Sequence, residues 1–154
     1  MKNEQTRCVI TGLGVISAIG KNVGECWNNI LLSKSGIDHT TTVDTAGCYA
    51  DYAAEVRDFA ENNPALDRSA ALCLHAADEA MKDAALGDFG GDEKVSVIMG
   101  SCVGGGRSIE NYYKNGKHTE DIPKMPIGAI ANHVAEAYHA GGVVTNVANA
   151  CAAG

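Results

Sequence analysis

The sequence feature that most constrains the fold is the run at residues 143–154, V-V-T-N-V-A-N-A-C-A-A-G. Its β-branched residues and its lack of charge are typical of an interior strand that is covered on both faces. The small residues around Cys151 predict a sharp turn from strand to helix, which would present the thiol as a nucleophile elbow presents a serine. If a helix began at Cys151, its free N–H groups and its dipole would favour the thiolate, the form that attacks acyl carbonyls.

Composition places the chain among ordinary folded domains. With 154 residues, of which 45% are hydrophobic and 20% charged, we expect one domain with its own core. The formal net charge of −7 argues against nucleic acid or an anionic membrane surface as the main partner. No segment approaches the roughly 20 apolar residues of a membrane span, so no membrane partner is expected either.

The six cysteines form no C-x-x-C pair and no cluster with histidine at zinc-like spacing. Several lie in apolar runs, where a free cysteine behaves as a small hydrophobic residue. We therefore expect reduced thiols, no metal site and a cytoplasmic location. His75 is expected to be a packing or surface residue, because no second ligand follows it at i+3 or i+4.

The start of the chain reads as a short apolar strand at residues 8–10, followed by a turn at Gly12 and Gly14. The letters G-L-G-V-I-S resemble a dinucleotide-binding fingerprint, but Ser17 occupies the place of the third glycine, and no acidic residue ends a convincing second strand. A structural turn is the favoured interpretation, with dinucleotide binding as the alternative. We expect no cofactor.

Two helices are predicted in the first half of the chain. Asn22 is a good N-cap for the first, which is expected to end near residues 35–36 and to use Trp27 as a core anchor. Asp67 caps the second, which is expected to run to about residue 85 with a stripe of small residues that permits close packing. The segment between them is polar and irregular, with one short strand expected at residues 52–56.

The second half contains another buried strand, at residues 95–99, followed directly by the glycine-rich run at 100–106. Such a loop forms either a backbone cradle for an anion or a place where two backbones pass closely, and it lacks the lysine of a P-loop. A short helix at 108–113 and a surface loop at 116–125 are expected next. Pro126 then opens a helix.

That last helix is expected to run through His139, with Ile130 and Val134 on its apolar face. His133 and His139 lie off the face, so solvent exposure is favoured over a catalytic pair with cysteine. The order of elements is strand, helix, helix, strand, glycine loop, helices, strand and cysteine turn. This alternation predicts an α/β domain with a mainly parallel central sheet.

Four motifs resemble, in order and spacing, the β-ketoacyl-acyl-carrier-protein synthases of the elongating type. They are R-C-V-I-T-G-L-G-V-I-S-A-I-G, G-S-C-V-G-G-G, P-I-G-A-I-A-N and N-A-C-A-A-G. The ketosynthase domains of polyketide synthases are similar. The resemblance implies the thiolase-like fold, a layered α/β arrangement of two related halves. Residues 1–154 then form the N-terminal half-domain, which ends at the nucleophile turn, and the complete protein is expected to be a homodimer.

The resemblance also implies a chemistry. Cys151 would take an acyl group from acyl carrier protein as a thioester, and the carbanion from a decarboxylated malonyl thioester would attack it. The Cys151 amide would serve as one donor of the oxyanion hole. Val103 falls where the family places an apolar residue that limits acyl-chain length, and Asn132 falls on a family asparagine near the active-site wall.

The sequence departs from the family pattern at several positions, including Asn149, Val143, Cys102 and Ala153. These departures bear on substrate preference more than on chemistry. The second half of the family's fold, which carries two active-site histidines, a lysine and another oxyanion-hole loop, is absent from these 154 residues. The half alone is therefore expected to be inactive.

Two other functions stay open at this point. The first is a ketosynthase-like partner subunit without condensing activity, but such partners usually lack the cysteine, so Cys151 weighs against it. The second is a small α/β binding or redox module, which would require a complete, monomeric fold with a soluble sheet edge. The sequence does not distinguish fatty acid, polyketide and aryl-polyene products.

Overall fold

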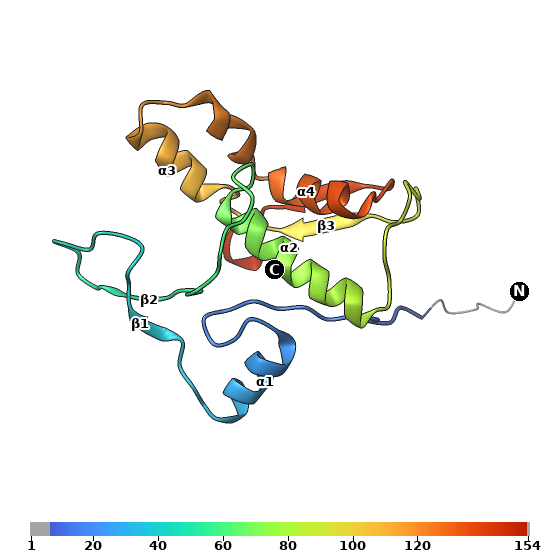
Figure 1. The fold of residues 1–154 in the computed structure, drawn as a ribbon, viewed down its shortest axis with the longest axis horizontal. Helices are drawn as coiled ribbons and strands as arrows, with labels where there is room; N and C mark the ends of the chain where they lie inside the picture. Colours follow the sequence, from blue (N-terminus) through green and yellow to red (C-terminus); the bar gives the residue numbers. More distant parts are fainter. Residues whose placement is uncertain (1–6, 154) are drawn as a thin grey trace, which may run out of the picture.

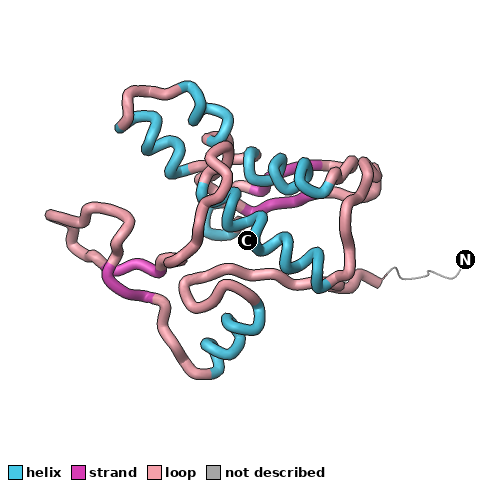
Figure 2. The backbone as a smooth tube through the Cα atoms, in the orientation of Figure 1, coloured by secondary structure: helices cyan, strands magenta, loops and turns pink. Residues whose placement is uncertain are grey.

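The computed structural model describes residues 7–153 of the chain (Figure 1). Helices are separated by long irregular connections, which Figure 2 shows as loop segments. In chain order the elements are α1 (Val23–Leu31), β1 (Ile37–His39), β2 (Tyr52–Ala54), α2 (Arg68–Asp83), β3 (Val97–Gly100), α3 (Gly106–Lys114), the 3₁₀ helix η1 (Thr119–Lys124), α4 (Ala129–Tyr138), β4 (Val144–Val147) and the 3₁₀ turn η2 (Ala150–Ala152).

The central feature is a parallel pair, β3 and β4, joined by a crossover through α3, η1 and α4. Residues pair in register from Val97 with Val144 to Gly100 with Val147. Helix α4 packs against both strands, and α2 packs against α4, which gives a sheet, a helix layer and a second helix layer (Figure 1). The predicted α/β class with a parallel sheet is confirmed, and this sheet has two strands among the described residues.

The core lies on α4. Its buried residues are Ala129, Ile130, Ala131, Val134 and Ala135. Ile130, Ala131 and Val134 were predicted from the sequence, whereas Ala129 and Ala135 were not, and Ile127 and Tyr138, also predicted for this face, are only half-buried. Ala70, 1% exposed, is the buried residue that α2 contributes. Small side chains on both helices allow their backbones to approach closely, as the stripe of small residues on α2 predicted. The capping role of Asp67 is also confirmed, because its carboxylate accepts the N–H of Ser69.

The strand predicted at residues 8–10 is wrong, because the described chain has no strand there and these residues are exposed. The segment instead runs beside α2. The Leu13 N–H donates to Asp83 Oδ2 at 2.9 Å, and the Val15 N–H donates to Glu79 Oε2 at 3.0 Å. Two carboxylates of α2 therefore accept backbone N–H groups that would bond to a neighbouring strand if this segment were part of a sheet. The structural interpretation of the glycines is supported, since a Cβ at Gly14 would lie 1.8 Å from Ala76 O.

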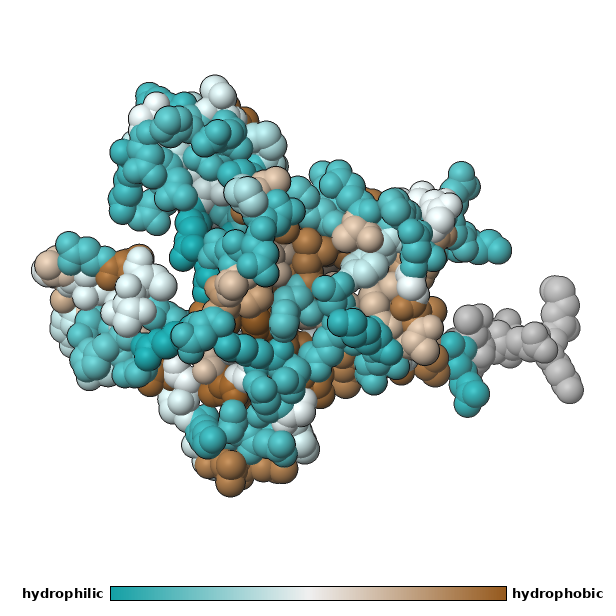
Figure 3. All heavy atoms as spheres, in the orientation of Figure 1, coloured by the Kyte–Doolittle hydropathy of each residue, from teal (hydrophilic) through white to brown (hydrophobic). Residues whose placement is uncertain are grey.

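Helix α1 begins as predicted but packs differently. Asn22 Oδ1 accepts the Glu25 N–H at 2.8 Å, which confirms the N-cap, and the helix ends at Leu31, before the predicted 35–36. Trp27 is not a core anchor, because it is 59% exposed and Cys26 is the one buried residue of α1. Few contacts hold α1 to the rest of the described chain: the Val23 N–H donates to Glu79 Oε1 of α2 at 2.8 Å, and the Cys26 thiol donates to Gly20 O at 3.3 Å. Most of its large apolar side chains are exposed. Apolar side chains gather at the lower edge of Figure 3, where α1 lies.

The prediction that the last strand is covered on both faces is also wrong for the described chain. Val143 and Val147 are 65% and 46% exposed. Helix α4 makes the main helix contacts with the sheet, and it can cover only one face. Elsewhere, β1 and β2 form a separate antiparallel pair; β2 confirms the short strand predicted at 52–56, whereas β1 was not predicted.

Candidate functional site

Cys151 lies in η2, a 3₁₀ helix of one turn, four residues after β4 ends at Val147. Its side chain is exposed. The turn is closed by hydrogen bonds from the Ala152 N–H to Asn149 O at 3.0 Å and from the Ala153 N–H to Ala150 O at 3.2 Å. Ala150 has a φ of +46°, a left-handed conformation that strains a residue with a Cβ. The predicted sharp turn is therefore present, with its strain at the residue before the cysteine.

The glycine-rich loop follows β3 at the same end of the sheet. A Cβ at Gly105 would lie 2.0 Å from Lys124 O, and one at Gly104 would lie 2.7 Å from Ile127 Cα. The glycines therefore permit a close passage of two backbones, the second of the two interpretations from the sequence. An anion cradle is not supported, because the N–H groups of Gly104, Gly105 and Gly106 donate to atoms of the protein itself.

The topology brings the three predicted site residues to one edge. Parallel strands end at a common edge, so Val103, three residues beyond Gly100, and Cys151, four residues beyond Val147, both follow that edge. Helix α4 runs back across the sheet. Its carboxyl end binds the loop before β3, where the Phe89 N–H donates to Tyr138 O at 2.9 Å. Its amino end adjoins the glycine loop and carries Asn132.

Each of the three side chains is accessible. Val103 is 61% exposed, Cys151 is exposed, and Asn132 is exposed in the first turn of α4. The backbone N–H of Asn132 donates to Gly128 O at 3.1 Å, an ordinary helical hydrogen bond. The arrangement offers a thiol, an apolar side chain and an amide from three different elements.

A buried carboxylate fixes the first turn of α3, directly after the glycine loop, and the sequence predicted only half of its role. Asp67, 5% exposed, caps α2 through Ser69 and also accepts the Ser108 N–H at 2.9 Å and the Ser108 hydroxyl at 2.7 Å. The N-cap of α3 is Gly105, which has no side chain, so Asp67 supplies the missing cap. Burial alone would raise the pKa of Asp67, but the hydrogen bonds from Ser69 and Ser108 lower it overall.

Other ionisable groups are spread over the surface. His139 Nδ1 lies 2.6 Å from Asp88, His133 lies 3.6 Å from Glu136, and His75 contacts Lys21 O at 2.8 Å. His75 and His139 are exposed as predicted, whereas His133 is half-buried, with 24% of its side chain exposed. Between residues 7 and 153 no group of three or more metal-binding side chains comes together. All six cysteines are free, and burial raises the pKa of the Cys73 thiol.

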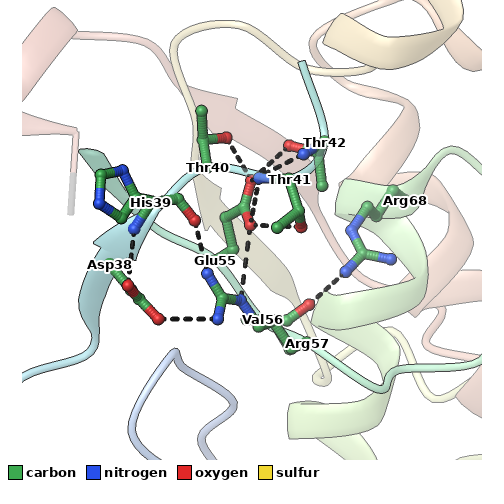
Figure 4. A network of polar contacts seen from close by, with 9 residues as sticks. All are labelled: Asp38, His39, Thr40, Thr41, Thr42, Glu55, Val56, Arg57 and Arg68. Carbon is green, nitrogen blue, oxygen red and sulfur yellow. Dashed lines mark hydrogen bonds and ion pairs between the residues drawn. The ribbon is translucent and has the colours of Figure 1, made fainter. Parts of the chain in front are cut away.

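The most extensive polar network lies away from the cysteine edge, at the β1–β2 pair (Figure 4). Glu55, whose side chain is 8% exposed, accepts hydrogen bonds from backbone and hydroxyl groups of the threonines at 40–42. These bonds hold the pKa of Glu55 far below its usual range. A pocket of about 600 Å³ adjoins the network and is lined partly by Arg68 and Arg107. None of the predicted site residues lines it.

Among the described residues no helix is both long and apolar enough to cross a membrane. The fold of this chain matches part of the fold of solved ketosynthases. The ishigamide ketosynthase/chain length factor matches 95% of this chain with a TM-score of 0.81 and 27% identity. A type II polyketide synthase ketosynthase, solved in complex with its acyl-carrier protein, matches 95% with a TM-score of 0.76 and 26% identity.

The sequence comparison gives the family. Residues 5–154 match the beta-ketoacyl synthase, N-terminal domain, and the chain belongs to this family. The 3-oxoacyl-[acyl-carrier-protein] synthase 2 of Coxiella burnetii is 36% identical over 121 residues, which cover 71% of this chain. The chain spans 28% of the length of that relative and 40% of the ishigamide ketosynthase/chain length factor.

Proposed function

We propose that residues 1–154 form the N-terminal half-domain of a β-ketoacyl-acyl-carrier-protein synthase that lengthens acyl chains by decarboxylative Claisen condensation. The observation that carries the proposal is the position of Cys151, exposed on the turn that follows β4, in a chain that matches the family over residues 5–154. A thiol at the end of a strand, surrounded by small residues, is open to an incoming thioester.

Cys151 acts as the nucleophile. Its thiolate attacks the carbonyl carbon of an acyl thioester, and the carrier's thiolate leaves as the acyl group passes to Cys151. Loss of CO₂ from a malonyl thioester then gives a carbanion, which forms the new carbon–carbon bond at the acyl carbonyl and expels the Cys151 thiolate. The Cys151 backbone N–H stabilises the oxyanion in both steps. The remaining catalytic groups come from the other half of the fold, so this half alone is inactive.

Val103 and Asn132 line the path of the acyl chain. Val103 offers an exposed apolar side chain on the loop beside the cysteine edge, where its size limits how long an acyl chain is accepted. Asn132 forms part of the wall from the first turn of α4. The product, a fatty acid or a polyketide, depends on pocket residues that lie outside this half.

Acyl carrier protein is the partner that delivers both thioesters, in the cytoplasm. The structural relative solved with its acyl-carrier protein supports this assignment.

The complete protein is a homodimer, which is supported by the exposed valines of the edge strand β4. A non-condensing partner subunit is the second candidate, because one structural relative is a ketosynthase/chain length factor. The presence of Cys151 favours the condensing subunit.

The test is a condensation assay with the complete protein that contains this chain, an acyl thioester and malonyl-acyl carrier protein. We expect a β-ketoacyl product two carbons longer than the starting acyl group. The Cys151→Ala variant should lose condensation by at least about 10³-fold. Condensation that survives this substitution at the wild-type rate would exclude Cys151 as the nucleophile.

A further inference from the structure

Asn146 in β4 has a side chain that reaches beyond the end of the neighbouring strand. It pairs in register with Met99 of β3, yet its Nδ2 donates to Ser101 O at 2.8 Å, past the end of β3 at Gly100. The Ser101 N–H donates in turn to Val147 O at 3.2 Å. Both backbone polar groups of Ser101 are therefore bound to β4, one of them by a side chain.

Ser101 begins the turn that presents Val103. Its hydroxyl accepts the Gly104 N–H at 3.2 Å, which closes the turn around Val103. The far end of the loop is fixed separately, because Gly104 O accepts the Ser69 hydroxyl at 3.1 Å and Gly105 lies against Lys124. The near end is held to β4 by two bonds, one to the Val147 backbone and one from the Asn146 side chain. Since Cys151 follows Asn146 by five residues, this amide joins the loop of Val103 to the strand that carries the cysteine.

The carbonyl oxygen of the Asn146 side chain has no hydrogen-bond partner among the described residues. This Oδ1 atom is the one buried side-chain polar atom without a hydrogen-bond partner in the part of the chain that the structure describes. A buried acceptor without a donor destabilises a fold, whereas an apolar residue of the same shape avoids that cost. An asparagine here therefore supplies a donor to the Ser101 carbonyl and leaves its own acceptor unpaired. The observation favours a role in placing Ser101 over a role in holding the sheet together.

We infer that Asn146 is a positioning residue that sets the distance between Val103 and Cys151 and thereby the length of acyl chain the enzyme accepts. The inference rests on the proposed function, because it assigns the acyl chain to the space between these two residues. Asn146 acts through the Ser101 carbonyl and touches neither the thioester nor the carrier.

The test compares acyl transfer to Cys151 in the complete protein and in its Asn146→Leu variant, with short, medium and long straight-chain acyl thioesters as probes. Leucine keeps the shape of asparagine and removes both the donor and the unpaired acceptor, so the fold should persist. We expect the ratio of long-chain to short-chain transfer to change by about tenfold or more, since a single methylene in an apolar pocket already changes rates by that factor.

Two controls separate positioning from general damage. Alkylation of Cys151 by iodoacetamide, which needs no acyl pocket, should stay within about twofold of the wild-type rate. Thr145→Val alters the exposed neighbour of Asn146 on the opposite face of the same strand and should leave the chain-length ratio unchanged. A second variant, Asn146→Ala, removes the same Nδ2 donor and should shift the ratio in the same direction as Asn146→Leu.

The outcomes are distinct. An unchanged ratio in Asn146→Leu overturns the inference and leaves the proposed function standing. If that variant does not fold, Asn146→Ala decides, because it removes the same Nδ2 donor, and a wild-type ratio there overturns the inference. If the wild-type protein takes no acyl group on Cys151, the proposed function itself fails. A changed ratio with normal alkylation supports both.

Discussion

The two regions of this molecule are held together in different ways. The lobe built from α2, α4, β3 and β4 contains six of the seven buried apolar residues, five of them on α4. The outlying region, with α1 and the β1–β2 pair, contributes only Cys26 to that set. Polar contacts hold it together internally, such as those of Glu55 with the threonines at 40–42, and join it to α2, such as that of Arg68 with Val56 O at 2.6 Å. Figures 1 and 3 show this region projecting from the lobe.

The difference shows where the site obtains its rigidity. The cysteine turn and the glycine loop both follow strands of the packed lobe, and buried Asp67 fixes the start of α3, which directly follows the loop. A reactive group needs its supporting residues held in place by packing and hydrogen bonds. The outlying region offers large exposed apolar residues, among them Trp27 and Leu31, which are surfaces for further contacts.

The largest contrast is expected from truncating one large apolar residue in each region. Ile130, 6% exposed, should cost about 2–4 kcal/mol of unfolding free energy when changed to alanine, because a cavity remains in the α4 core. Trp27→Ala should cost about 1 kcal/mol or less, although it removes more atoms. Urea unfolding of the chain, followed by circular dichroism, measures both. Equal costs would contradict the division into two regions.

The next contrast compares how much stability is lost when a buried carboxylate, Asp67, or an exposed one, Asp44, is removed. Asp67→Ala removes the cap of two helices and leaves N–H groups near α2 and α3 without an acceptor, so a loss of about 2–3 kcal/mol is expected. Asp44→Ala, in the exposed loop between β1 and β2, removes one local hydrogen bond and should cost less than about 0.5 kcal/mol. Thermal unfolding of the two variants under matched conditions checks the difference. A mild Asp67 variant would show that the double cap is dispensable.

A glycine pair sharpens the comparison within the lobe. Gly105→Ala places a Cβ 2.0 Å from Lys124 O, and overpacking of this kind should destabilise by about 1–3 kcal/mol. A Cβ at Gly128 meets nothing within 4 Å, so Gly128→Ala should be neutral or slightly stabilising. Chemical unfolding of both variants gives the answer. If Gly105→Ala were as stable as Gly128→Ala, the close passage of the two backbones would be refuted.

The smallest effect is the pH dependence of Asp67. Its pKa is lower in the folded than in the unfolded chain, so the carboxylate contributes stability above its unfolded pKa of about 4. That contribution is lost as the pH falls through the folded pKa. The gap in unfolding free energy between wild type and Asp67→Asn should therefore shrink below about pH 4. A gap that stays constant from neutral to acid pH would argue against the charged form as the capping group.

Local features of the fold could be predicted from the sequence. Asn22 and Asp67 cap helices because each accepts an N–H two or three residues away, which makes the signal readable within one turn. The face of α4 followed from its helical periodicity. The motif positions also gave the family, which the comparison over residues 5–154 establishes.

The predictions that were wrong concerned features that depend on residues distant in the sequence. The burial of Trp27 and the pairing of residues 8–10 are set by what lies beside them in space, and neither neighbour is encoded locally. The cap that Asp67 provides for α3 joins it to Ser108, 41 residues further along the chain. The hydrogen bond from Asn146 to Ser101 joins residues that are 45 positions apart. No periodicity or spacing in the sequence reports such contacts. The roles of Cys151, Val103 and Asn132 remain predictions.

The most direct test of the account is to find where an acyl group attaches. The complete protein is incubated with an acyl-acyl carrier protein without malonyl donor, denatured, digested and analysed by peptide mass. We predict one thioester adduct, on Cys151, that is absent from the Cys151→Ala variant. An adduct on another exposed cysteine, such as Cys102, or no adduct at all, would contradict the assignment of Cys151 as the nucleophile.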